Sequence, residues 1–73
     1  MKGKPVLRRG VVYALEDGTF LSVINAQQRK VAISSELVHG PKGVSIDSLN
    51  CKLKIITQQQ VERILATASE VIA

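Results

Sequence analysis

Two apolar runs near the start of the chain are separated by a turn signal. Residues 10–15 and 19–25 are rich in β-branched and aromatic side chains, and Glu16-Asp17-Gly18 stands between them. Asp-Gly favours a type I′ turn, because both central residues of that turn need a positive φ. The pattern predicts a β-hairpin with a two-residue loop, in which Leu15 pairs with Phe20.

This register would leave apolar side chains on both faces of the hairpin. Residues paired across a ladder share a face, so one face would carry Val11, Tyr13, Leu15, Phe20 and Ile24. The other face would carry Val12, Ala14, Leu21 and Val23. An antiparallel sheet with one wet side should alternate apolar and polar residues. Both faces therefore need cover, from a helix, from a barrel interior or from a second subunit.

Later segments predict further short strands. Residues 29–34 form a third strand of a meander if Val31 and Ile33 point inward, and residues 51–56 alternate again, with Lys52 and Lys54 on the solvent side. Lysine on the outer side of a strand discourages aggregation through the edge. Between these strands the sequence predicts one helical turn at 35–38, a Gly- and Pro-rich loop at 39–43 and a brief strand at 44–46.

The last segment, 58–73, predicts an amphipathic helix. Thr57 is a suitable N-cap, and Gln60 completes a capping box. Apolar residues recur at helical spacing and form one stripe: Val61, Ile64, Leu65, Ala68, Val71 and Ile72.

Together these elements predict one α+β domain in a chain of 73 residues. We expect an antiparallel β-meander of three to five strands over residues 10–73, with one C-terminal amphipathic helix packed on it. The alternative is a small, partly open barrel of the OB type. Residues 1–9 are expected to form a basic N-terminal arm.

One stretch of the chain resembles a known family of RNA-binding domains. Gly10-x-Val12, the run from Asp17 to Leu21 and the run from Val31 to Leu37 are similar to the first three strands of the OB domains repeated in a large ribosomal protein. The likeness covers under half of the chain, and Ala32 stands where those domains often carry a histidine. It implies a β-meander.

The positive charge is concentrated at the start of the chain. Ten Lys and Arg residues oppose six Asp and Glu, and Lys2, Lys4, Arg8 and Arg9 leave six bases against six acids in the rest. A short basic arm can contact phosphates, and it can equally keep a small protein soluble. Lys30, Lys52 and Lys54 would extend a phosphate-binding surface.

The sequence supplies no recognisable catalytic or metal-binding set. One histidine, His39, and one cysteine, Cys51, are too few for a structural zinc site, and a single cysteine cannot form an internal disulfide. Tyr13 and Phe20 could stack on bases, but their apolar neighbours favour a core role. We expect no enzyme, no cofactor and no metal.

These observations favour a small non-enzymatic nucleic-acid-binding or regulatory protein whose basic arm contacts phosphates, with RNA and DNA both open. The alternative is a homo-oligomeric interaction module, most simply a homodimer, whose interface is the face of Val12, Ala14, Leu21 and Val23. The basic start is not followed by an apolar run of signal-peptide length, so we expect a cytoplasmic protein with no membrane partner.

Overall fold

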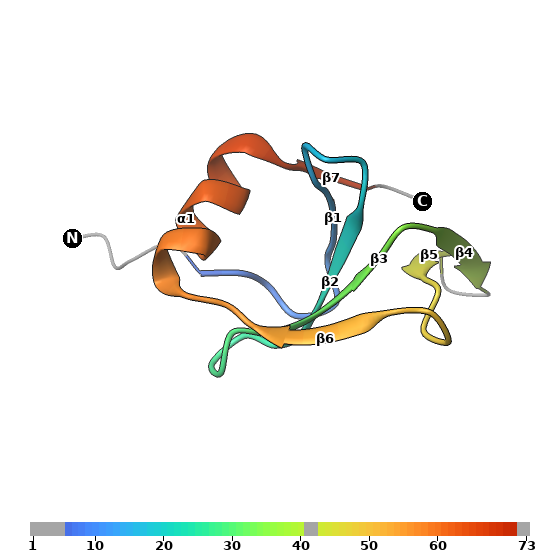
Figure 1. Cartoon of the computed structure of the whole chain (residues 1–73), viewed down its shortest axis with the longest axis horizontal. Coiled ribbons are helices and arrows are strands. Elements are labelled where there is room, and N and C mark those ends of the chain that lie inside the picture. The colour runs from blue at the N-terminus through green and yellow to red at the C-terminus, as the bar shows by residue number, and fades with distance from the viewer. Residues whose placement is uncertain (1–5, 41–42, 72–73) are drawn as a thin grey trace.

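The computed structural model describes residues 6–40 and 43–71 of the chain and has an α+β architecture (Figure 1). Five strands form an antiparallel sheet in the order β6-β3-β2-β1-β7, and β4 and β5 form a separate two-stranded sheet. The elements are β1 (Val12–Ala14), β2 (Phe20–Asn25), β3 (Lys30–Ser34), β4 (Leu37–Gly40), β5 (Gly43–Ile46), β6 (Lys52–Ile55), α1 (Gln58–Thr67) and β7 (Ser69–Glu70). The expected meander with a C-terminal helix is confirmed, and the sheet does not close into a barrel.

The β1–β2 hairpin forms as predicted, but its register differs by one residue. Tyr13 pairs with Leu21 and Ala14 with Phe20. The Leu15 carbonyl oxygen accepts from Gly18 N–H at 3.2 Å, and Leu15 N–H donates to the Thr19 carbonyl oxygen at 2.8 Å. These bonds enclose a three-residue loop, in which Gly18 adopts a φ of +91°. A tight turn followed by a glycine in the left-handed region is the usual three-residue hairpin connection.

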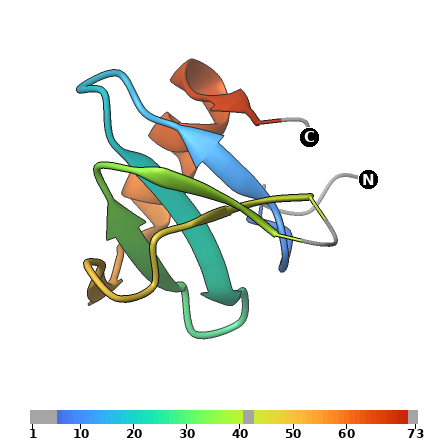
Figure 2. The same ribbon diagram turned by 90° about the vertical axis from the view of Figure 1, so that its right-hand side faces the viewer.

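The observed register divides the apolar residues between two clusters on opposite faces of the sheet. Tyr13, Leu21, Val23 and Val31 pack with α1 on one face, which we call the helix face. Val12 and Ala32 pack with Ile46 of β5 on the other, which we call the hairpin face. Figure 2 shows α1 behind the sheet and the β4–β5 hairpin in front of it. The shift places Tyr13 and Phe20 on opposite faces, so the expectation that they share a face is wrong.

Helix α1 begins as predicted and ends sooner than predicted. Gln60 N–H donates to the Thr57 hydroxyl, and Thr57 N–H donates to the Gln60 side chain, so the capping box is complete. The helix ends at Thr67, after which the backbone of Ala68 is extended. Ser69 and Glu70 then pair with β1 as the edge strand β7. Val71 consequently packs on the hairpin face, whereas the helical stripe packs on the helix face.

The segment expected to be a helical turn and a loop is instead the β4–β5 hairpin. Leu37 pairs with Ile46, and Gly40 pairs with Gly43 at the far end; residues 41 and 42 lie outside the described residues. The Ser34 side chain is buried and accepts a hydrogen bond from Glu36 N–H at 3.2 Å, where β3 gives way to this hairpin. The hairpin covers part of the hairpin face, which the sequence had left without cover.

Leu7 belongs to the core although it precedes the first strand. Its side chain is 2% exposed and contributes to the cluster on the helix face. The packed body therefore reaches into the segment expected to be an arm.

Candidate nucleic-acid interface

Part of the hairpin face is not covered by the β4–β5 hairpin. Ile24 is 44% exposed, and on β6 Leu53 and Ile55 are 61% and 68% exposed. Ile55 pairs with Lys30 and Leu53 with Ala32, so these side chains share the hairpin face. The open surface therefore combines apolar side chains with a lysine.

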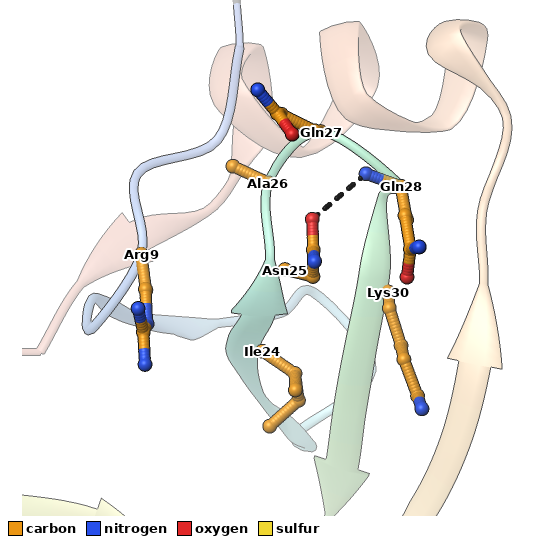
Figure 3. A pocket seen from close by; sticks show the side chains of 7 residues that line it. All are labelled: Arg9, Ile24, Asn25, Ala26, Gln27, Gln28 and Lys30. Carbon is orange, nitrogen blue, oxygen red and sulfur yellow. Dashed lines mark hydrogen bonds between the residues drawn. The ribbon is translucent and has the colours of Figure 1, made fainter.

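A shallow hollow of about 470 Å³ lies beside the turn between β2 and β3. Figure 3 shows Arg9 and Lys30 on either side of Ile24. The turn itself is braced, because Gln28 N–H donates to Asn25 Oδ1 at 3.0 Å. Seven residues line the hollow: Arg9, Ile24, Asn25, Ala26, Gln27, Gln28 and Lys30. Guanidinium, ammonium and amide groups are those that contact phosphates and base edges.

A second hollow continues along the sheet from Lys30. It is lined by Lys30, Leu53, Lys54 and Ile55 and measures about 440 Å³. Lys30 belongs to both hollows, so cationic side chains run from Arg9 to the edge strand β6.

No acidic residue lines either hollow among the described parts of the chain. Two acids lie in the β1–β2 loop, two flank the β4–β5 hairpin, one lies on α1 and one on β7: Glu16, Asp17, Glu36, Asp47, Glu62 and Glu70. The Asp17 and Asp47 carboxylates are held within their own turns. Hydrogen bonds from the Thr19 side chain and N–H lower the pKa of Asp17, and those from the Asn50 side chain and Leu49 N–H lower the pKa of Asp47.

Three arginines that line neither hollow form contacts within the protein. Arg8 pairs with Glu70 at 2.7 Å, and Arg63 pairs with Glu16 at 3.6 Å. Arg29 has a structural role: its Nε donates to the Ile56 carbonyl oxygen at 2.9 Å, and its φ of 56° lies in the left-handed region.

Apart from Arg29, whose guanidinium bonds to a backbone carbonyl, the cations that form no ion pair within residues 6–40 and 43–71 are Arg9, Lys30, Lys52 and Lys54. All four were predicted from the sequence as phosphate-binding residues. Of the other three predicted residues, Arg8 is paired, and Lys2 and Lys4 lie outside the described residues.

The structure does not bring the aromatic residues to this surface. Tyr13 is 2% exposed on the helix face, and Phe20 packs against the cluster on the hairpin face. Tyr13 is therefore too buried to stack on bases, and the half-buried Phe20 contributes to core packing. The amides of Asn25, Gln27 and Gln28 were not predicted as part of the site, although the polar run between two predicted strands was a usable signal.

The four residues predicted for an oligomer interface do not form one surface. Leu21 and Val23 are 0% and 3% exposed on the helix face, under α1. Val12 is 5% exposed and Ala14 is half-buried, and both lie on the opposite face. The one-residue shift of the hairpin register separates the two pairs.

Neither candidate for other chemistry is assembled into a site in the described structure. His39 is exposed on β4. The Cys51 thiol is within 3.5 Å of the Ser48 carbonyl oxygen and packs against the hairpin-face cluster. Among the described residues, no three His, Cys, Asp or Glu side chains gather where they could hold a metal ion. Within the same residues, no helix is long and apolar enough to cross a membrane.

Comparison with known proteins adds no assignment: no family model, no curated protein and no solved structure matches this chain.

Proposed function

We propose that the protein is a small, non-enzymatic nucleic-acid-binding protein whose phosphate contacts come from Arg9, Lys30, Lys52 and Lys54, together with the basic N-terminal segment. The observation that carries this proposal is the separation of charge. Arg9, Lys30 and Lys54, which form no ion pair among the described residues, line two adjoining hollows, while the acids lie elsewhere. A groove of one sign concentrates the field that attracts a polyanion.

The hollow beside the β2–β3 turn supplies the best-defined part of this surface. Arg9 and Lys30 would contact consecutive phosphates, and Gln27 and Gln28 would reach sugars or base edges, since side-chain amides both donate and accept. Arg8 can join them at small cost, because its ion pair with Glu70 is exposed and such pairs contribute about 0 to 1 kcal/mol.

The test is fluorescence anisotropy of labelled 12-nucleotide RNA, single-stranded DNA and duplex DNA over a series of salt concentrations. Lys30→Gln is expected to weaken single-strand binding several-fold and to reduce the slope of log K against log salt by about 0.7. Arg63→Gln is the matched control, because it removes one charge from α1 on the other face. No binding at low salt, or an equal loss in both variants, would contradict the proposal.

The alternative function is a homo-oligomeric interaction module. The observation in its favour is the exposure of Ile24, Leu53 and Ile55 on the open part of the hairpin face. Light scattering at micromolar to millimolar concentration tests it directly. A monomer across that range would exclude this function, whereas a dimer dissociated by Leu53→Asp would support it.

A further inference from the structure

We propose that the free edge of β6 docks an extended segment of a partner protein in which apolar and acidic residues alternate, so that the segment adds a strand to the sheet. This inference goes beyond the proposed function, because it adds the backbone of β6, Leu53 and Ile55 to the two lysines of that strand, which the proposed function also uses. The observations that carry it are an unpaired strand edge and the different chemistry of its two sides.

The backbone of β6 is paired on one side only. Its neighbour in the sheet is β3, and no strand of the described residues lies along its other edge. Ile56 N–H donates to the Arg29 carbonyl oxygen at 3.0 Å. Hydrogen-bonded and non-hydrogen-bonded pairs alternate along an antiparallel ladder. Lys52 and Lys54 therefore direct their backbone groups to β3, and Leu53 and Ile55 direct theirs outward.

The two sides of this edge differ in chemistry. Leu53 and Ile55 are more than half exposed on the hairpin face, whereas Lys52 and Lys54 are exposed on the opposite side of the strand. Residues directly opposite each other in a ladder share a face. An added strand would therefore set apolar side chains beside Leu53 and Ile55, and acidic side chains beside the two lysines.

Charge argues against a second copy of the chain as the occupant. The antiparallel register that uses every outward group pairs Leu53 of one copy with Ile55 of the other. That register sets the two copies of Lys54 directly opposite each other. Like charges in this position destabilise a ladder, and lysine on an edge strand opposes self-pairing. A segment with acids at alternate positions turns the same lysines into favourable pairs.

The probe is a fluorescein-labelled, N-acetylated peptide of four Glu-Val repeats, titrated against the full chain by fluorescence anisotropy. We expect at least tenfold tighter binding than for a peptide of four Glu followed by four Val, which has the same charge and composition. A peptide of four Lys-Val repeats is expected not to bind. Equal affinity for the alternating and the block peptide would assign the contact to charge alone and overturn the proposal.

Backbone methylation tests strand addition without altering the protein. The valines would lie opposite Leu53 and Ile55, so their N–H groups would face β6. N-methylation of all four valines is expected to weaken binding at least tenfold, whereas N-methylation of all four glutamates should leave most of the affinity. Equal affinity of the two methylated peptides would contradict a strand pairing.

Amide hydrogen exchange locates the contact and separates it from nucleic-acid binding. Saturating peptide is expected to slow exchange at Leu53 and Ile55 at least tenfold, while a 12-nucleotide RNA leaves these amides unchanged. If the RNA slows both amides and the peptide does not, the strand-addition proposal is wrong. If neither RNA nor DNA binds but the peptide protects both amides, the docking edge stands and the nucleic-acid function does not.

Discussion

At the scale of single residues, burial separates leucines that are chemically identical. Leu21 is fully buried under α1, and Leu53 is 61% exposed on β6. Leu21→Ala is expected to lower the free energy of unfolding by about 2 to 5 kcal/mol, because it removes buried methyl groups and leaves a cavity. Leu53→Ala should change it by no more than about 0.5 kcal/mol. Urea unfolding followed by circular dichroism measures both.

The outcome of this pair also tests the assignment of Leu21 to the core and of Leu53 to the surface. A large loss in Leu53→Ala, or a small one in Leu21→Ala, would contradict the assignment of faces. A cost of a few kcal/mol at Leu21 would take much of the stability of a domain this small, which is about 4 to 11 kcal/mol at typical values per residue.

The loop of the β1–β2 hairpin shows why the sequence predicted this hairpin but not its register. Asp17 and Gly18 suit a two-residue loop, and Gly18 equally suits the left-handed position that ends a three-residue loop. The hydrophobic pattern usually selects the register by burying one face. Here both registers place apolar residues on both sides. The pattern therefore cannot select between them, since α1 covers one face and the β4–β5 hairpin covers part of the other.

At the scale of elements, the start of α1 was predictable and its end was not. The capping box is a local signal that needs only Thr57 and Gln60. The end depends on distant residues, since Ser69 and Glu70 leave the helix to pair with β1. Val71 also fits the three-and-four spacing of a helix, so periodicity alone continued the helix past Thr67. Pairing with β1 therefore ends the helix at Thr67, although the local spacing of apolar residues favours a longer helix.

The capping box itself gives a prediction at this scale. Thr57→Ala removes the hydroxyl that accepts from Gln60 N–H at 3.1 Å, leaving that helix-terminal donor without its partner. We expect the free energy of unfolding to fall by about 1 kcal/mol. Thr57→Ser keeps the hydroxyl and is the matched control. Urea unfolding measures the free energy of unfolding of both variants. An equal loss in the two would assign the effect to the methyl group.

The β4–β5 hairpin was predicted only in part, for a related reason. Val44 and Ile46 alternate as a strand should, and that strand is present as β5. Its partner β4 contains an exposed histidine and ends at a glycine, so it carries little β signal of its own. Leu37 is assigned to a strand only by its pairing with Ile46.

At the scale of the whole molecule, the candidate site was predictable as a set of residues but not as a place. The sequence shows which residues are basic, and the excess of positive charge lies at its start. Which cations form ion pairs depends on the fold. Glu70 reaches Arg8 because β7 pairs with β1. Lys30 lies beside Ile55 because β3 pairs with β6. The acid-free surface emerges from these long-range pairings.

Two acids outside that surface give the whole molecule a defined response to low pH. Hydrogen bonds within the turns hold the pKa of Asp17 and of Asp47 below the ordinary value of 3.8. As the pH falls, the unfolded chain therefore takes up these protons before the folded chain does. The stability that the two carboxylates contribute is complete above the unfolded pKa. It is lost as the pH falls from near 4 through the lower folded pKa values.

The double variant Asp17→Asn and Asp47→Asn isolates this effect, because asparagine keeps a hydrogen-bond acceptor in each turn but takes up no proton. Urea unfolding between pH 2.5 and 6 at constant ionic strength, a range chosen to bracket the ordinary carboxyl pKa of about 4, should show a fall below pH 4 in the parent protein. The fall should be shallower in the variant, and the two proteins should run parallel above pH 5. An equally steep fall in both would show that the acid response comes from other groups, such as repulsion among the excess cations as carboxylates are neutralised.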